Sequence, residues 1–382
     1  MIQLTNVIPS ISASQAERTV RSLLERADIQ VGGNRPHDIQ VHNPAFYTRA
    51  LRDGRLGVGE SYMAGEWDAI ALDQFIAQLL LARLNEQVQD WRTILYVAAA
   101  RTFNLQNATR VFQAGERHYD IGNDLYQAML GETLSYTCAY WKNAKTLDEA
   151  QRAKLDLICR KVGLRPGMKV LELGCGWGTF AKYAAEHYGA EVTGYTVSKE
   201  QVALGRELCK GLPVDLRLED YRNARGAYDR VISIGMMEHV GYKNHRAYFE
   251  TVDRCLKPDG IAFVHTIGSN YSQKIIDSFF HKYLFPNALI PSLAQINGAM
   301  EGLFVPEDVH NIGPDYDPTL MAWNENFEAA WPSLRKNYDE RFYRLWRFYL
   351  LSSAGSFRAR FTQLYQVVMT REGRLQPACR LS

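Results

Sequence analysis

From about residue 155 onward, the chain alternates between short apolar runs and longer segments with a helical spacing of apolar residues. Short apolar runs bounded by turn residues are typical of strands that are buried on both faces of a parallel sheet. Their alternation with helices predicts an α/β protein with a Rossmann-like, doubly wound sheet. Five strands are expected, at residues 170–173, 191–195, 214–218, 230–234 and 261–265.

The first 90 residues follow a different pattern, which predicts a small and mainly helical unit. A helix is expected directly after Ser14, a short strand at 39–43, and an amphipathic helix at 72–84, with four glycines punctuating the stretch from 54 to 65. No acidic, His and Cys side chains cluster here in a catalytic arrangement, so the unit either only packs, or presents the catalytic domain to a bilayer or pairs protomers. The predicted boundaries are 1–90 for this unit, 91–115 for a helical linker, and 116–382 for the catalytic domain.

Composition and charge narrow the class of protein. The chain has 382 residues, enough for two domains, and its 46% hydrophobic and 23% charged residues are ordinary for a globular protein. The formal net charge of +2 argues against a strongly basic nucleic-acid binder. The six cysteines are scattered without a C-x-x-C pair, which indicates reduced thiols rather than disulfides or a metal site.

Two segments bear on the location of the protein. Residues 1–13 carry no basic residue ahead of an apolar core, so we do not expect a signal peptide. The most apolar stretch, 69–84, is interrupted by polar side chains and falls short of the roughly 20 apolar residues that a bilayer span needs. We therefore expect a cytoplasmic protein whose contact with a membrane is peripheral.

A glycine-rich turn follows the first predicted strand. Gly174, Gly176 and Gly178 come directly after V-L-E-L, which contains Glu172, and a helical pattern follows them. Strand, glycine turn and helix start together form a nucleotide-type site. The alternating glycines differ from the dinucleotide fingerprint G-x-G-x-x-G and resemble motif I of methyltransferases that use S-adenosylmethionine (SAM). A dinucleotide site or a plain tight turn is the alternative.

The residues just after each strand are further site candidates, because ligands bind at the carboxyl ends of strands in such sheets. An acid usually follows the second strand and binds the ribose hydroxyls. This chain has no acid there, so we expect Thr196 and Gln201 to supply uncharged hydrogen bonds. Asp220, followed by Tyr221, is the expected acceptor for the adenine amino group, with a loop acid facing water as its alternative.

Seven longer strings stand out, namely E-x-H-Y-D-I-G-N-D at 116–124, Y-T-C-A-Y-W at 136–141, L-E-L-G-C-G-W-G at 171–178, M-x-E-H-V-G at 236–241, H-T-I-G at 265–268, Y-L-F-P-N at 283–287, and Y-D-x-T-L-M-A-W at 316–323. Together these strings resemble the cyclopropane fatty acid synthases. The likeness is strong over about residues 90–370, and the N-terminal segment favours the bacterial phospholipid-modifying branch, because the similar mycolic acid cyclopropane synthases generally lack such an extension.

This resemblance implies methylene transfer from SAM to the cis double bond of an unsaturated phospholipid, at the inner face of the membrane, by a homodimer. It also implies a bound bicarbonate as the base that removes a proton while the ring closes. The implied bicarbonate ligands are Cys138, Glu238, His265, Ile267 through its backbone, and Tyr316. Tyr136 and Thr137 join the implied cofactor site, and Tyr136 and Tyr316 also offer aromatic faces to passing positive charge.

Each of these residues has a simpler interpretation. Cys138 is then a small buried residue, His265 a core histidine bonded to backbone, and Glu238 an acid favoured at a helix start. The nearest functional alternative is a related fatty-acyl C-methyltransferase that leaves a methyl or methylene branch. More distant ones are a methyltransferase acting on N or O of a small molecule, and a membrane-surface protein with a relic SAM fold.

Two segments are candidates for contact with lipid. An apolar stripe over residues 275–285, inserted after the fifth strand, is either an ordinary core helix or a cover for the acyl chain, within inserted helices at about 270–345. A basic and aromatic stretch at 341–360 is either a docking surface for anionic headgroups or a solvated helix face. Its arginines are Arg341, Arg344, Arg347, Arg358 and Arg360.

Overall fold

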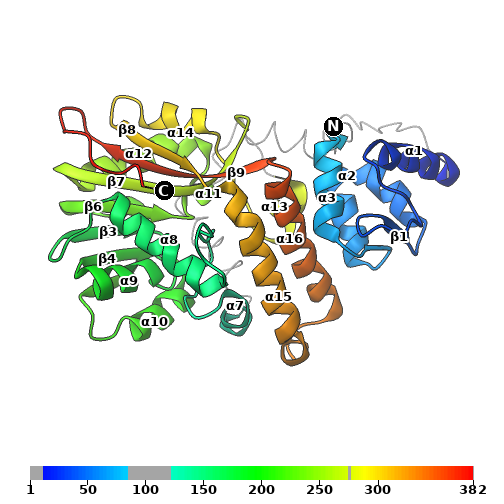
Figure 1. Ribbon diagram of the computed structural model, residues 1–382, viewed down its shortest axis with the longest axis horizontal. Helices are drawn as coiled ribbons and strands as arrows, with labels where there is room; N and C mark the ends of the chain where they lie inside the picture. The colour runs from blue at the N-terminus through cyan, green and yellow to red at the C-terminus, as the bar shows by residue number, and fades with distance from the viewer. Residues whose placement is uncertain (1–11, 85–121, 274–276, 382) are drawn as a thin grey trace, which may run out of the picture.

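The computed structural model describes residues 12–84, 122–273 and 277–381. In Figure 1 the N-terminal unit lies at one end, the sheet lies at the other end, and two long helices run between them. The predicted linker at 91–115 and the first six residues of the string at 116–124 fall outside the described residues. Among the described residues, no helix is both long and apolar enough to cross a bilayer.

The N-terminal unit is mainly helical, as predicted. Its elements are α1 (Ala13–Arg26), β1 (Ile39–Val41), α2 (Ala45–Met63), β2 (Trp67–Ala69) and α3 (Leu72–Leu81). Helix α1 begins earlier than predicted, because Ser12 caps it by accepting a hydrogen bond from the Gln15 N–H. The glycine-rich stretch is not a loop: α2 runs through most of it, and Gly54 kinks the helix with a φ of 54°.

The central sheet has seven strands in the order β5-β4-β3-β6-β7-β9-β8. All five predicted strands are present and parallel, with β7 extending beyond the predicted 261–265 at both ends. Two antiparallel strands, which the sequence pattern did not reveal, complete the sheet. The strands are β3 (Lys169–Leu173), β4 (Glu191–Thr196), β5 (Val214–Leu218), β6 (Tyr228–Ile234), β7 (Leu256–Ser269), β8 (Val305–Asn311) and β9 (Thr362–Thr370).

Helices cover both faces of the sheet. On one face, Ile158 and Phe180 pack with Ile232, and on the other face Phe249 packs with Val231. Neighbouring strand residues thus point to opposite layers, which is the doubly wound arrangement that was predicted. The helices are α8 (Leu147–Lys161), α9 (Thr179–Tyr188), α10 (Lys199–Leu208), α11 (Met237–Val240), α12 (His245–Cys255) and α14 (Leu293–Met300), with α7 (Asn123–Leu130) nearby and the 3₁₀ turns η1 (Tyr221–Asn223), η2 (Tyr242–Asn244) and η3 (Gly313–Asp315).

Helices α13 (Ser278–Tyr283), α15 (Tyr316–Leu334) and α16 (Glu340–Arg358) join the sheet to the N-terminal unit. A Cβ atom on Gly355 would lie 2.4 Å from the Asp73 carbonyl oxygen, so α16 and α3 approach as closely as backbone allows. One hydrophobic cluster contains Trp67 of the N-terminal unit together with Trp323 and Trp346. The N-terminal unit and the catalytic domain therefore share a core.

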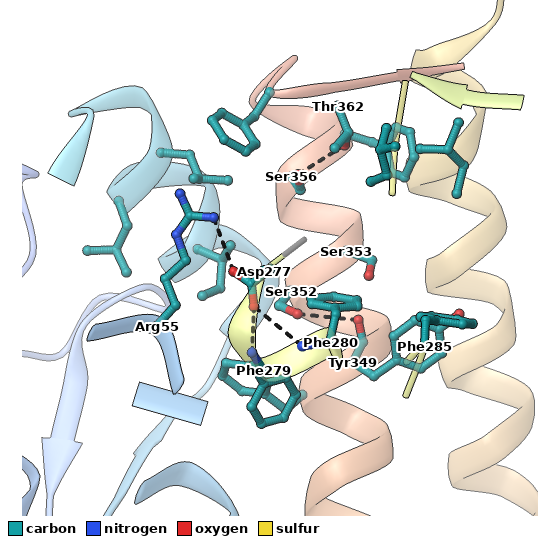
Figure 2. A pocket seen from close by; sticks show the side chains of 18 of the residues that line it. Arg55, Asp277, Phe279, Phe280, Phe285, Tyr349, Ser352, Ser353, Ser356 and Thr362 are labelled. Carbon is teal, nitrogen blue, oxygen red and sulfur yellow. Dashed lines mark hydrogen bonds and ion pairs between the residues drawn. The ribbon is translucent and has the colours of Figure 1, made fainter. Parts of the chain in front are cut away.

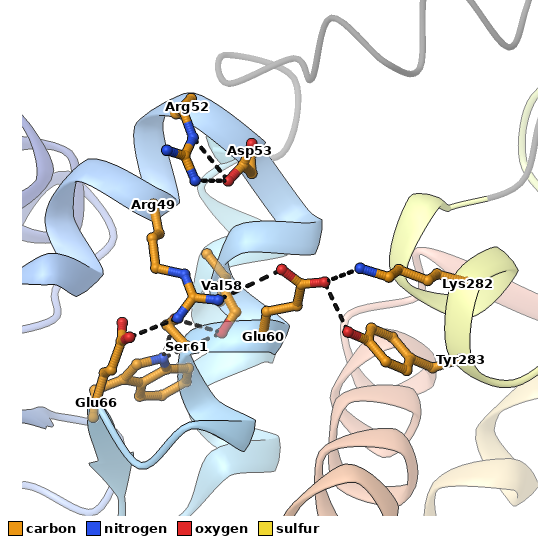
Figure 3. A network of polar contacts seen from close by, with 10 residues as sticks. Arg49, Arg52, Asp53, Val58, Glu60, Ser61, Glu66, Lys282 and Tyr283 are labelled. Atoms are coloured by element: carbon orange, nitrogen blue, oxygen red, sulfur yellow. Dashed lines mark hydrogen bonds and ion pairs between the residues drawn. The ribbon is translucent and has the colours of Figure 1, made fainter.

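Polar contacts fasten α2 to α13 (Figure 3). Glu60 of α2 forms an ion pair with Lys282 and accepts a hydrogen bond from the Tyr283 hydroxyl at 2.7 Å. On the other side, Arg49 lies 3.5 Å from Glu60 and 2.6 Å from Glu66. Glu60 thus links the N-terminal unit to the short helix that follows strand β7.

The arginines of the basic and aromatic stretch are largely engaged within the protein, which neither interpretation of that stretch foresaw. Arg344 contacts Asp68 at 2.7 Å and stacks over the Tyr62 ring at 4.2 Å. Arg347 pairs with Glu328 on α15, Arg358 pairs with Asp317 and Asp73, and Arg360 donates to Gln363. These side chains bind neighbouring elements and do not form a free basic face.

Candidate active site

The glycine turn between β3 and α9 packs closely against the end of the neighbouring strand β4. Gly174, Gly176 and Gly178 have φ values of 78°, 55° and 77°, which favour glycine. The N–H groups of Gly174 and Cys175 both donate to the Tyr195 carbonyl at 2.9 Å, which fixes the turn beside the end of β4. A Cβ atom on Gly174 would lie 2.8 Å from the Met236 side chain. At Gly174, therefore, a larger residue would have to displace Met236.

Glu172 lies beneath this turn rather than in the open part of the site. Its side chain is buried, and burial raises its pKa to about 8, although a hydrogen bond from the Ala181 N–H at the start of α9 opposes the shift. Its second carboxyl oxygen has no hydrogen-bond partner among the described residues. The geometry favours a role in supporting the turn, and direct contact with a cofactor stays a prediction.

Four other predicted cofactor residues lie at or shortly after the carboxyl ends of β4 and β5. Thr196 donates to the Gln201 side chain at 3.2 Å, and both are buried. Asp220 caps η1 and binds the Arg222 guanidinium, with 2.5 Å between Oδ2 and Nη2. Asp220 is therefore ion-paired rather than a loop acid facing water. Tyr221 is mostly buried and packs edge-on against Tyr248.

Glu238, on the short helix α11, is held against the end of strand β7. Its Oε1 accepts a hydrogen bond from the Ile267 N–H at 2.6 Å, and its buried Oε2 has no partner among the described residues. Burial raises the pKa of Glu238 to about 7, although the bond from Ile267 opposes this shift. The carboxyl group can therefore exchange a proton near neutral pH. The Ile267 N–H, predicted to contact bicarbonate, is engaged by Glu238.

His265 lies on β7 with one ring nitrogen supported and the other unpaired. Its Nδ1 lies 3.4 Å from the amide nitrogen of Gln366, and with this amide donating to Nδ1 the ring proton is carried by Nε2. No described residue accepts from Nε2. Burial holds the pKa of His265 well below its ordinary value, so the ring is neutral. His265 thus presents a neutral N–H donor to a ligand. A histidine that only packs in the core would instead have both ring nitrogens hydrogen-bonded within the protein.

Three further predicted residues surround this pair, and one does not. Tyr316, at the start of α15, stacks on Phe357 with ring centroids 4.4 Å apart, and it lines the same cavity as Glu238 and His265. Tyr136 and Thr137 also line that cavity. Cys138 is fully buried outside the lining, where its thiol donates to the Ala139 carbonyl at 3.2 Å. Burial raises its thiol pKa, so the simpler interpretation of Cys138 fits the structure better.

Two residues of α8 that the sequence analysis did not predict, Gln151 and Lys154, support the loop that contains Tyr136 and Thr137 through hydrogen bonds. The ammonium group of Lys154 lies 2.9 Å from the Thr137 hydroxyl, and the Gln151 amide donates to the Thr137 carbonyl at 3.0 Å. Lys154 is buried, and desolvation lowers its pKa to about 8. The available signal was the spacing of Gln151 and Lys154 on the same helix face as the apolar Ile158.

An apolar cavity of about 380 Å³ extends from this group toward the N-terminal unit. Its catalytic end is lined by Thr137, Gly235, Glu238 and His265, and Figure 2 shows the part enclosed by α13 and α16. Phe279, Phe280 and Phe285 of the predicted apolar stripe line it, while residues 275 and 276 fall outside the described part. The N-terminal unit supplies α1, α2 and α3 side chains such as Leu24, Phe46, Val58, Ile76 and Leu80.

Comparison with known proteins matches the sequence to one family. A family model described as mycolic acid cyclopropane synthetase matches residues 106–367. A cyclopropane-fatty-acyl-phospholipid synthase of Escherichia coli (strain K12) is 50% identical over 355 residues, which cover 93% of this chain and 93% of that protein. Tuberculostearic acid methyltransferase UfaA1 of Mycobacterium tuberculosis is 32% identical, with 87% of this chain and 83% of that protein covered.

Solved structures give a consistent result. The cyclopropane synthase MmaA2 from Mycobacterium tuberculosis is 27% identical with a TM-score of 0.65, over 70% of this chain and 100% of that chain. The mycolic acid cyclopropane synthase CmaA1, complexed with SAH and CTAB, is 29% identical with a TM-score of 0.64, over 68% of this chain and 98% of that chain.

Proposed function

The chain belongs to the mycolic acid cyclopropane synthetase family, and we propose that it acts as a cyclopropane-fatty-acyl-phospholipid synthase. It is a SAM-dependent enzyme that transfers a methylene group to the cis double bond of an unsaturated phospholipid acyl chain. The observation that carries this proposal is the apolar cavity, which brings Glu238 and His265 together at one end and is otherwise lined mainly by hydrocarbon side chains.

The reaction explains why the cavity is apolar. The sulfonium methyl of SAM bonds to one alkene carbon as its bond to sulfur breaks, and S-adenosylhomocysteine departs. The neighbouring carbon is left positively charged, and the ring closes when the new methyl loses a proton. An alkene is a weak nucleophile, so the walls must align it and exclude water that would capture the cation. Tyr136 and Tyr316 offer aromatic faces to that charge.

We propose that Glu238 and His265 hold the base that accepts this proton. Both line the cavity, and each carries one buried polar atom without a partner among the described residues: Glu238 Oε2 is an acceptor and His265 Nε2 is a donor. This pairing fits bicarbonate, which donates one hydrogen bond and accepts others, and which would supply the general base when bound. Tyr316 adds a phenol to the same region, whereas Cys138 and the Ile267 N–H have less support because backbone or Glu238 engages them.

A fatty-acyl C-methyltransferase that leaves a branch is the second candidate, because UfaA1, 32% identical to this chain, is a tuberculostearic acid methyltransferase. Incubation of the purified protein with SAM and vesicles of dioleoyl phosphatidylglycerol separates the two. The proposal predicts loss of vinyl protons and the appearance of upfield ring protons in the proton NMR spectrum of the lipid. A new methyl or methylene signal without ring protons would favour the branch-forming enzyme instead.

We further propose that the protein works peripherally at the cytoplasmic face of the membrane, where SAM and bilayer phospholipid meet. The apolar cavity that receives an acyl chain supports this location. The homodimer and the division into residues 1–90, 91–115 and 116–382 stay predictions. Sedimentation velocity tests the dimer directly, and a single species with the mass of one chain would contradict it.

A further inference from the structure

One end of the cavity differs from the rest of its wall, because polar side chains line it (Figure 2). Among the described lining residues, Arg55 of α2 is the one Lys or Arg. Helix α16 and the ends of strands β7 and β9 contribute hydroxyl groups to the lining of the same cavity. These hydroxyl residues are Ser269, Ser352, Ser353, Ser356 and Thr362.

The pairing of β7 with β9 relates this polar end to the catalytic end. Three alternate residues of β7, His265, Ile267 and Ser269, line the cavity. Their partners on β9 are Gln366, Leu364 and Thr362, in that order. Residues two apart on a strand share a face, so the cavity wall changes along one row from imidazole to hydrocarbon to hydroxyl. Four residues of strand span roughly 13 Å. This length is of the same order as the separation of a mid-chain double bond from the ester end of an acyl chain.

The polar end presents donors to a ligand. Arg55 forms an ion pair with Asp277 at 3.1 Å and lies 5.8 Å from the ring centroid of Phe361, and both partners line the cavity. That ion pair uses one of the five guanidinium N–H groups, and 44% of the Arg55 side chain is exposed. Nearby, the hydroxyls of Ser356 and Thr362 lie 2.9 Å apart. A cation with spare donors beside hydroxyl groups suits an anionic oxygen ligand.

We propose that this polar end binds the phosphodiester of the phospholipid substrate, with Arg55 as its cationic ligand. This inference rests on the proposed function. A phosphodiester carries one negative charge and only accepts hydrogen bonds, which matches Arg55 and the hydroxyl groups. The ligand also carries acyl chains, because the remainder of the cavity is apolar and leads to His265.

Asp277 is the partner of Arg55 that a bound phosphate would replace. One of its carboxyl oxygens accepts from the Phe279 N–H at 2.9 Å and caps α13, while the other pairs with Arg55. When phosphate takes the guanidinium, the cap on α13 remains. Asp277 therefore competes with the phosphate for Arg55, and this predicts opposite effects from removing the charge of each residue.

The test compares dioleoyl phosphatidylglycerol with dioleoylglycerol, which has the same acyl chains and no phosphate, in micelles of one nonionic detergent. The measured quantity is the ratio of kcat/KM for the two lipids. Arg55→Gln should lower the ratio by about tenfold or more, as loss of a charge-assisted contact does. Asp277→Asn should maintain or raise it, since asparagine still caps α13.

Arg52→Gln is the matched control, because Arg52 lies on the same helix, pairs with Asp53 and does not line the cavity. Its ratio should equal that of the wild type. An unchanged kcat/KM ratio in Arg55→Gln would overturn the proposal. An equal decrease of the ratio in Arg55→Gln and in Asp277→Asn would also overturn it, because the ion pair would then merely join α2 to α13. If the wild type forms no ring product from dioleoyl phosphatidylglycerol, that result would instead contradict the proposed function.

Discussion

The backbone N–H of Ile267 donates to the carboxylate of Glu238 at 2.6 Å, and this bond leaves one buried oxygen of Glu238 without a partner among the described residues. Strand β7 thereby fixes the orientation of an acid on a different element. The bond favours the charged form of Glu238, and burial disfavours it more strongly. The site therefore holds an acid that titrates near neutrality, beside the neutral imidazole of His265.

Glu238→Gln should lower kcat by about 10²–10⁴-fold, because the amide keeps the shape of the side chain and loses the acceptor for a proton or for a protonated base. SAM affinity, measured by calorimetry, should be unchanged. A variant with the wild-type kcat would show that Glu238 only caps the end of β7.

The titration of Glu238 predicts a pH dependence. Activity of the wild type should rise as pH increases through about 7, where the buried carboxyl loses its proton, and Glu238→Gln should lack this rise. The folded-state pKa lies above the ordinary value, so this group contributes stability below that ordinary value, and the contribution is lost as pH rises through about 7. Urea unfolding should thus show Glu238→Gln gaining stability relative to the wild type between pH 4 and pH 8.

Gly174→Ala should abolish SAM binding, because its Cβ atom would meet Met236 at 2.8 Å in the turn. Gly167→Ala is the matched control, since Gly167 has a similar φ of 76° and nothing within 4 Å of the added atom. Both variants should lose roughly 1–2 kcal/mol of stability from the left-handed backbone. Calorimetry with SAM should separate them, and equal affinities would contradict the assignment of the turn.

Gly59→Ala tests whether the N-terminal unit forms part of the acyl cavity. The new Cβ atom would lie 2.3 Å from the ring of Phe279, which would have to move within the cavity lining. We expect a higher KM for phospholipid and unchanged SAM affinity. Gly298→Ala is the control, because it lies in helix α14 with nothing within 4 Å. An unchanged KM in Gly59→Ala would mean that α2 does not shape the lipid site.

The Glu60 contacts predict energetic coupling between α2 and α13. A double-mutant cycle of Glu60→Gln and Lys282→Met should give a favourable coupling of roughly 0.2–1 kcal/mol in urea unfolding, because the Lys282 side chain is 49% exposed. Additive effects of the two changes would show that this ion pair does not contribute to holding α13.

The strands and the cofactor turn were predictable because their signals are local. Buried runs such as the one at 170–173 and the alternation of Gly174, Gly176 and Gly178 specify strand and turn without knowledge of distant partners. Strand β9 was missed because its partners are β7 and β8, and long helices separate it from both in the sequence. Its pairing is decided by tertiary contacts rather than by local pattern.

The arginines show the same limit at the level of side chains. The sequence placed Arg344 and Arg358 among aromatic residues but could not show that Asp68 and Asp73, far away in the N-terminal unit, face them. Cys138 belongs to a string that resembles the family, yet only the structure shows its thiol bonded to backbone outside the cavity lining. Motifs identified the site, and tertiary packing decides which of its residues meet the substrate.

Ring closure by this enzyme requires that the transferred methyl group itself loses a proton. The most direct test supplies SAM with a trideuterated methyl group and measures the mass of the modified acyl chain. Retention of two deuterium atoms in a saturated ring is the predicted result. Retention of all three, in a branched chain, would contradict the account, because the proton would then have left the acyl chain or not left at all.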